Sequence, residues 1–122
     1  MDLTNYTVEA SGTLLDVARA ISANHSRCVI VVSDGKVVGV ISEGDLVRAL
    51  LRGTDIHSPM NPFINHAVSF LPKRDIGQAL ELFRKYGISL IPVLNDDLEL
   101  EDVITLQQVL TQVGLLELGS DS

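Results

Sequence analysis

A hydroxyl and a carboxylate stand three residues apart at the most informative junction of the sequence, Ser42-Glu43-Gly44-Asp45. They follow an apolar run and precede a stretch with helical spacing, so a strand is expected to end where a helix begins. The N-terminus of a helix presents unbonded N–H groups and partial positive charge, which favour anions. A carboxylate there can accept both hydroxyls of a ribose, so Ser42 and Asp45 are candidates for binding a sugar phosphate.

The same spacing also has a purely structural interpretation. Ser-x-x-Asp is typical of a capping box, in which the hydroxyl and the carboxylate each accept a backbone N–H. Thr105-x-x-Gln108, later in the chain, fits that motif as well. Spacing alone favours capping, because such caps are common at helix N-termini. Both interpretations therefore stay open at this point.

The elements that would position the junction occur twice. Apolar residues at i, i+3, i+4 and i+7 predict one helix face over residues 14–21, and the same spacing returns 62 positions later over residues 76–83. Thr13 and Asp75, directly before these stretches, are suitable N-caps. The repeated positions are Leu14, Val17, Ala18 and Ile21 in the first copy and Ile76, Ala79, Leu80 and Phe83 in the second.

Apolar, partly β-branched runs follow each predicted helix, residues 29–32 and 91–94, and each leads through a turn to residues 40–42 or 103–105. Shorter extended stretches, residues 6–8 and 68–70, precede the helices. Each copy thus reads strand–helix–strand–strand–helix, a βαββα unit of mixed α/β class. A unit of this size buries little apolar surface alone. We therefore expect two copies packed face to face with pseudo-twofold symmetry and a pair of equivalent clefts. The expected division is repeat one at 5–53, a linker at 54–65, repeat two at 66–114 and a C-terminal tail at 115–122.

Composition excludes several classes of protein. The 122 residues carry 9 Lys and Arg against 16 Asp and Glu, a net charge of −7 that disfavours binding to nucleic acid. No apolar run is long enough to span a membrane, and the single cysteine, Cys28, fits a reducing cytoplasm. The three histidines have no metal-ligand spacing with Cys28 or a carboxylate, so no metal site is expected. No nucleophile–base set typical of an enzyme is present either.

The ordered set of elements occurs twice, each with a Gly-x-x-Ser/Thr-x-x-Asp-like junction, although Asp102 replaces the glycine in the second copy. This set resembles a tandem pair of cystathionine β-synthase (CBS) domains, also called a Bateman module. The resemblance covers roughly residues 5–113. It implies that an adenosyl compound lies in the clefts between the copies, with AMP, ADP and ATP the first candidates and S-adenosylmethionine or NADH less favoured. No other cofactor is implied.

Carried over residue by residue, the resemblance places two sites. Site one would comprise Ile41, Ser42, Asp45, Val68, Ser89 and Leu90. Site two, expected to be weaker, would comprise Thr105, Gln108, Val8, Arg27 and Cys28, although Arg27 could serve either cleft. Gln108 lacks the carboxylate charge of Asp45, and the acids of the adjoining hairpin, Asp96, Asp97, Glu99, Glu101 and Asp102, would repel a phosphate nearby.

The resemblance favours a regulatory sensor rather than an enzyme. Such a module would bind its ligand and act on a separate effector protein in trans, and it would usually form a homodimer through its helices. Apolar residues that could supply the dimer surface are Leu46, Val47, Leu50, Leu51, Leu115 and Leu116. The alternative is a structural module that dimerises and binds no ligand, which the departure at Gln108 favours somewhat.

Overall fold

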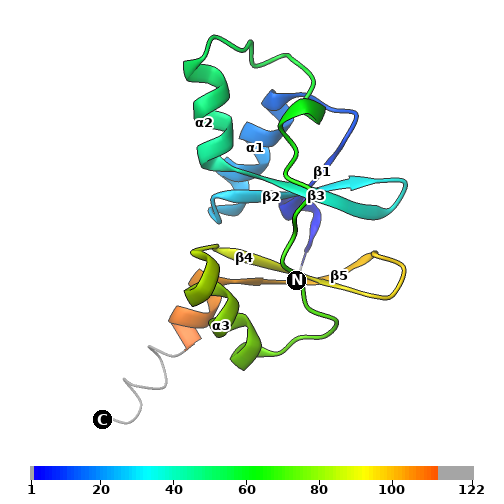
Figure 1. The fold of residues 1–122 in the computed structure, drawn as a ribbon, viewed down its shortest axis with the longest axis vertical. Coiled ribbons are helices and arrows are strands. Elements are labelled where there is room, and N and C mark those ends of the chain that lie inside the picture. The colour runs from blue at the N-terminus through cyan, green and yellow to red at the C-terminus, as the bar shows by residue number, and fades with distance from the viewer. Residues whose placement is uncertain (1, 113–122) are drawn as a thin grey trace.

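The computed structural model describes residues 2–112 of the chain. Repeat one contains a short 3-10 turn, three strands and two helices (Figure 1). The elements, in chain order, are η1 (Thr4–Tyr6), β1 (Thr7–Glu9), α1 (Leu14–Asn24), β2 (Cys28–Ser33), β3 (Lys36–Ser42) and α2 (Glu43–Leu51). β1 pairs with β2 in parallel and β2 pairs with β3 antiparallel, so the sheet order is β1-β2-β3.

Repeat two follows a segment that contains η2 (Asn61–Phe63). Its elements are α3 (Ile76–Tyr86), β4 (Leu90–Leu94) and β5 (Leu100–Thr105), with β4 and β5 antiparallel, and a helical stretch at 106–112. The expected N-cap Asp75 accepts the N–H of Gln78 at 3.0 Å. At Thr13, the N-cap of α1, the bond has the opposite direction, because the Thr13 N–H donates to Asp16 Oδ2 at 2.9 Å.

The expected first strand of repeat two, residues 68–70, does not form. That part of the chain is reduced to one parallel bridge, between Leu71 and Val93. Two hydrogen bonds, from Leu71 N to Pro92 O and from Leu94 N to Leu71 O, hold it beside β4. Phe70 is exposed, so no buried alternation fixes a longer strand here.

The two hairpins match residue by residue. Cys28 lies opposite Ser42, and Leu90 lies opposite Thr105, at the positions that the repeat predicts. Each hairpin also carries an irregularity at the same place, after Val31 in repeat one and after Val93 in repeat two. A shared bulge is a strong sign of common construction, because bulges are specific features of a strand pair.

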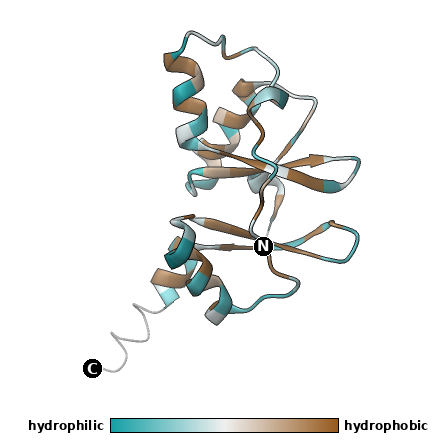
Figure 2. Cartoon of the chain, in the orientation of Figure 1, coloured by the Kyte–Doolittle hydropathy of each residue, from teal (hydrophilic) through white to brown (hydrophobic). Residues whose placement is uncertain are grey.

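The sheets of the two repeats face each other, with the helices on the outer sides, as Figure 1 shows. Apolar strand residues lie at this interface (Figure 2). The cluster that joins the repeats consists of Ile30, Val37, Leu90, Leu94 and Val103. A backbone hydrogen bond from Val37 N to Leu98 O, 2.9 Å long, also crosses between the repeats. Burying such side chains contributes about 1.5–3 kcal/mol each, so contact between the repeats adds to the stability of the separate core cluster that each repeat has.

The linker packs along repeat one. The carbonyls of Ile56 and Ser58 accept the N–H groups of Leu15 and Leu14, and Met60 is wholly buried. Farther on, Asn65 exchanges backbone hydrogen bonds with Val40 of β3, at 2.9 Å each.

Glycine is required where the linker passes β3. A Cβ at Gly39 would lie 2.6 Å from the Asn65 carbonyl oxygen and would also collide with the side chain of Ile64. At the matching place in repeat two, Asp102 is accommodated and bonds Arg74 at 3.0 Å.

The apolar face expected for dimerisation is only partly exposed. Leu46 turns into the core of repeat one, whereas Val47, Leu50 and Leu51 are exposed on α2. Leu115 and Leu116, with the tail at 115–122, lie outside the described residues.

Candidate functional site

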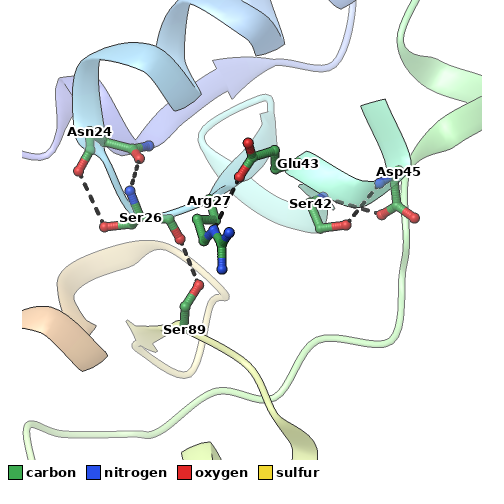
Figure 3. Close-up of polar contacts among 7 residues, drawn as sticks. All are labelled: Asn24, Ser26, Arg27, Ser42, Glu43, Asp45 and Ser89. Carbon is green, nitrogen blue, oxygen red and sulfur yellow. Dashed lines mark hydrogen bonds and ion pairs between the residues drawn. The ribbon is translucent and has the colours of Figure 1, made fainter. Parts of the chain in front are cut away.

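A cavity of about 750 Å³ lies between the two repeats at the start of α2. Its wall takes residues from the strand ends of both repeats and from the segment that leads into repeat two. Figure 3 shows part of this wall, with the Ser42–Asp45 turn and Arg27 on one side and Ser89 of repeat two on the other. We call this space cavity one. Its lining includes Arg27, Cys28, Ser42, Glu43, Gly44, Asp45, Arg48, Val68, Ser89 and Leu90.

Ser42 and Asp45 form a capping box, and Asp45 also faces cavity one. The Asp45 N–H donates to Ser42 Oγ at 3.1 Å, and the Ser42 N–H donates to Asp45 Oδ2 at 3.2 Å. Partial burial raises the pKa of the Asp45 carboxyl, but the bonds from Ser42 and from Arg48 outweigh it, so the pKa lies below its usual value. Asp45 is therefore a carboxylate near neutral pH. The capping and lining roles are held by the same residue.

Two arginines bring positive charge to cavity one. Arg48 Nη2 bonds Asp45 Oδ1 at 2.5 Å, and Arg27 Nε bonds Glu43 Oε2 at 3.3 Å. Arg27 has a φ of +62°, a left-handed conformation that is uncommon outside glycine. In Figure 3 the guanidinium of Arg27 lies between the start of α2 and Ser89. The wall of cavity one therefore carries two cationic and two anionic side chains, joined in two ion pairs.

The wall opposite Asp45 joins the two repeats. Ser89 Oγ donates to the carbonyl of Ser26 at 2.6 Å. The side chain of Asn24, which is buried, donates to the carbonyls of Asn5 and Cys28 and accepts the Ser26 N–H. These bonds satisfy the polar groups that a chain crossing between two small cores would otherwise leave unpaired.

Cys28 contributes a thiol rather than a thiolate. Burial, with a smaller contribution from the Asp45 charge, raises the pKa of the Cys28 thiol to about 12. The group is therefore neutral at physiological pH and is a poor nucleophile.

A second cavity, of about 450 Å³, lies at the pseudo-symmetric position, and we call it cavity two. Thr105 and Gln108 repeat the capping box there, with Gln108 N donating to Thr105 Oγ1 at 3.1 Å and Thr105 N donating to Gln108 Oε1 at 3.2 Å. All the described lining residues are uncharged. They are Tyr6, Asn24, Ser26, Thr105, Gln107, Gln108, Thr111 and Gln112.

The structure brings most of the predicted site-one residues together. Ser42, Asp45, Val68, Ser89 and Leu90 all line cavity one. Ile41 does not, because its side chain is wholly buried in the core of repeat one, on the opposite face of β3 from Val40 and Ser42. The ligand that these residues would hold stays a prediction.

The predicted site-two residues do not all lie together. Thr105 and Gln108 line cavity two, but Arg27 and Cys28 line cavity one, and Val8 packs in the core of repeat one. Among the described residues, none of the acids of the adjoining hairpin lines cavity two. Asp102 is instead paired with Arg74.

Three groups of lining residues were missed. Arg48 lies three residues after Asp45 on the same helix face, a spacing that could have indicated the ion pair. Thr111 and Gln112 lie at i+3 and i+4 from the predicted Gln108, a polar stripe that could have indicated the wall of cavity two. Ser69 and Asn65 line cavity one from irregular segments, for which no periodicity gives a signal.

Within residues 2–112, no three His, Cys, Asp or Glu side chains come together in a way that could hold a metal ion. None of the helices in that range has the length and apolar character needed to cross a bilayer.

Solved structures with this arrangement are numerous. A CBS domain protein from Pyrobaculum aerophilum, complexed with AMP, is 22% identical with a TM-score of 0.73, covering 89% of this chain and 90% of that one. A protein from Vibrio cholerae described as an acetoin utilization protein is 26% identical with a TM-score of 0.79, covering 96% and 89%. A CBS domain pair in complex with 5′-methylthioadenosine and S-adenosyl-L-methionine is 19% identical with a TM-score of 0.75, covering 88% and 86%.

The chain spans between 21% and 64% of the length of the curated relatives it matches. The sequence profile of the CBS domain matches residues 2–52 and again residues 55–114. The two matches coincide with the two βαββα-type repeats that meet at cavities one and two. The chain therefore belongs to the CBS domain family and carries a tandem pair of these domains.

Proposed function

We propose that this chain is a regulatory, non-catalytic module that binds an adenosyl compound in cavity one and acts on a partner protein in trans. The observation that carries the proposal is the position of the Asp45 carboxylate, on the wall of a cavity of about 750 Å³ between the repeats. A cavity of this size is in the usual range for small-molecule sites, roughly 300–1,000 Å³.

The chemistry of the wall fits a nucleoside with a charged tail. Asp45 offers carboxylate oxygens to ribose hydroxyls, and the apolar side chains of Val68 and Leu90 offer a surface for the base. The names of two structural neighbours support this ligand class, since one is complexed with AMP and another with 5′-methylthioadenosine and S-adenosyl-L-methionine. AMP, ADP and ATP are the first candidates.

Sensing requires that the ligand bind one state of the module better than another, because a ligand with equal affinity for both shifts nothing. A ligand in cavity one would touch both repeats, so it would favour one relative position of the repeats over others. A partner protein that binds across the interface between the repeats would then respond to the ligand.

Thermal shift with AMP, ADP, ATP, S-adenosylmethionine and NADH tests the proposal. A ligand at about 100 times its dissociation constant adds roughly 2.7 kcal/mol to the free energy of unfolding. We expect a shift with at least one of these compounds, a loss of that shift in Asp45→Ala, and its retention in the matched variant Gln108→Ala. No shift with any compound, at concentrations up to the millimolar range, would refute the proposed ligand class.

A second candidate function is a dimerising structural module. It is favoured by the exposed residues Val47, Leu50 and Leu51 on α2, which form an apolar face. Sedimentation of the wild type and of Leu51→Glu separates the two: a module whose only role is dimerisation loses its dimer in this variant and shows no shift with any ligand.

A further inference from the structure

We infer that Arg48 determines the charge of the ligand that cavity one accepts, favouring adenosyl compounds with a phosphate over neutral or cationic ones. The inference rests on the proposed function, because it concerns the ligand of the same cavity. The neighbours named above hold compounds of three different charges, an anion, a neutral thioether and a sulfonium cation. Fold alone therefore leaves ligand charge open.

The guanidinium of Arg48 is folded over the first turn of α2, on the wall of cavity one. Its Nη2 bonds Asp45 Oδ1 at 2.5 Å, and its Nη1 lies 3.2 Å from the place that a Cβ on Gly44 would occupy. The side chain of Arg48 is 60% exposed, so a ligand in the cavity can reach it. Gly44 thus leaves room for the guanidinium beside the backbone.

The backbone under this guanidinium offers a further donor. The N–H of Glu43 bonds the Arg27 carbonyl at 2.8 Å, and the N–H of Asp45 bonds Ser42 Oγ. The Gly44 N–H between them lies in the first turn of α2, where backbone N–H groups have no partner within the helix. A phosphate oxygen accepted by this N–H would come next to Arg48, where a charge-assisted bond is stronger than a neutral one.

Asp45 can serve a ribose while it is paired with Arg48. An ionised carboxylate has about four acceptor positions, and Ser42 and Arg48 occupy two of those on Asp45. Arg48 is then placed to join the sugar and phosphate subsites, as a positioning group for Asp45 and a direct contact for the phosphate.

Arg48 determines whether the wall of cavity one is neutral or carries a net negative charge. The wall holds Arg27 and Arg48 against Glu43 and Asp45, so its formal charge is zero. Replacing Arg48 with a neutral residue leaves one net negative charge, in a chain whose total is already −7. Such a wall repels a phosphate and attracts a sulfonium, so the preference should reverse.

Isothermal calorimetry with AMP, adenosine and S-adenosylmethionine tests the inference on wild type, Arg48→Gln and Arg48→Lys. The matched control is Arg84→Gln, because Arg84 forms the same i,i+3 ion pair, with Glu81 at 2.8 Å, on a helix outside the cavity. We expect Arg48→Gln to weaken AMP by about tenfold or more. Adenosine should change by less than about twofold, S-adenosylmethionine should bind as well or better, and Arg48→Lys should recover part of the AMP affinity.

Three outcomes would overturn the inference. Equal loss of AMP and adenosine in Arg48→Gln would show that Arg48 acts only by holding Asp45. An unchanged ratio of AMP to S-adenosylmethionine affinity, or the same changes in Arg84→Gln, would remove its role in charge selection. These results leave the proposed function standing, whereas no response of the wild type to any of these compounds or to ADP, ATP or NADH would overturn both.

Discussion

Cavities one and two have matching backbone frameworks but differ in the charge of the side chains that line them. The hairpin register, the capping hydrogen bonds and the position between repeats are shared. Cavity one presents arginines and carboxylates, whereas every described lining residue of cavity two is uncharged. Gln108 makes the same two backbone bonds as Asp45, so the fold requires only an acceptor at that position. The negative charge of Asp45 therefore exceeds what capping needs, which supports a ligand role for cavity one.

The largest difference between the two junctions concerns stability rather than ligands. Gly39→Ala would force a Cβ into the Asn65 carbonyl and the Ile64 side chain, whereas Asp102 occupies the matching place in repeat two. We expect Gly39→Ala to lower the free energy of unfolding by about 3 kcal/mol, because overpacking against backbone cannot relax easily. Asp102→Ala, which loses a partly exposed ion pair with Arg74 and the bond from the Val103 N–H, should cost about 1 kcal/mol.

Urea denaturation of both variants measures this comparison. The midpoint should fall strongly for Gly39→Ala with an unchanged m-value, since a changed m-value indicates another state. Equal midpoints in the two variants would show that the passage of the linker over β3 does not constrain repeat one.

Exchanging the capping side chains of Asp45 and Gln108 tests whether the charge of Asp45 serves ligand binding. Asp45→Gln gives cavity one the capping group of cavity two, so the cap survives while the charge is lost. We expect affinity for the adenosyl ligand to fall by about 10- to 100-fold, the contribution of a charged hydrogen bond, with a change in unfolding free energy below about 1 kcal/mol.

Calorimetry and urea denaturation on the same samples separate these two effects. The reverse variant, Gln108→Asp, should leave the affinity of cavity one unchanged. A large loss of stability with no loss of affinity in Asp45→Gln would mean that Asp45 is only a cap.

The capping hydroxyls should be equivalent in the two repeats. Ser42→Ala removes the acceptor of the Asp45 N–H, and we expect it to cost about 1 kcal/mol of unfolding free energy. Thr105→Ala should cost at least as much, because Thr105 is buried and also loses a methyl group. Thr105→Ser, which keeps the hydroxyl, is the control, and thermal unfolding without ligand measures all three. A negligible change in Ser42→Ala would contradict the equivalence.

The fold was predictable because apolar periodicity and turn residues indicate both copies of the repeat. The helices at 14–24 and 76–86 and both hairpins follow patterns that local sequence determines. The predicted strand at residues 68–70 was wrong, because alternation over three residues is too short to fix a strand pairing. In this part of the chain, only Leu71 pairs with the neighbouring edge of β4. Tertiary pairing overrides so short a signal.

The site was predictable only in part, for a geometric reason. Ser42, Asp45, Val68, Ser89 and Leu90 reach cavity one because the pseudo-symmetry brings strand ends of both repeats together. Which cleft Arg27 enters depends on its left-handed backbone, since Ser26 on one side lines cavity two while Arg27 lines cavity one. A positive φ at a non-glycine residue leaves no mark in the sequence.

The smallest expected effect is that the contribution of Asp45 to the free energy of unfolding depends on pH, whereas that of Gln108 does not. The pKa of Asp45 in the folded state lies below its ordinary value of 3.8, so its ionised form stabilises the fold. That contribution is present above pH 3.8 and is lost as pH falls through the folded-state pKa. The difference in unfolding free energy between wild type and Asp45→Asn should be below about 1 kcal/mol, because solvent screens this partly exposed group. That difference should shrink between pH 6 and pH 3, whereas the difference for Gln108→Asn should not. Urea titrations at the two pH values measure both differences. If the difference between wild type and Asp45→Asn is the same at pH 6 and pH 3, the charge of Asp45 does not stabilise the folded state. Ligand binding is then the reason for that charge.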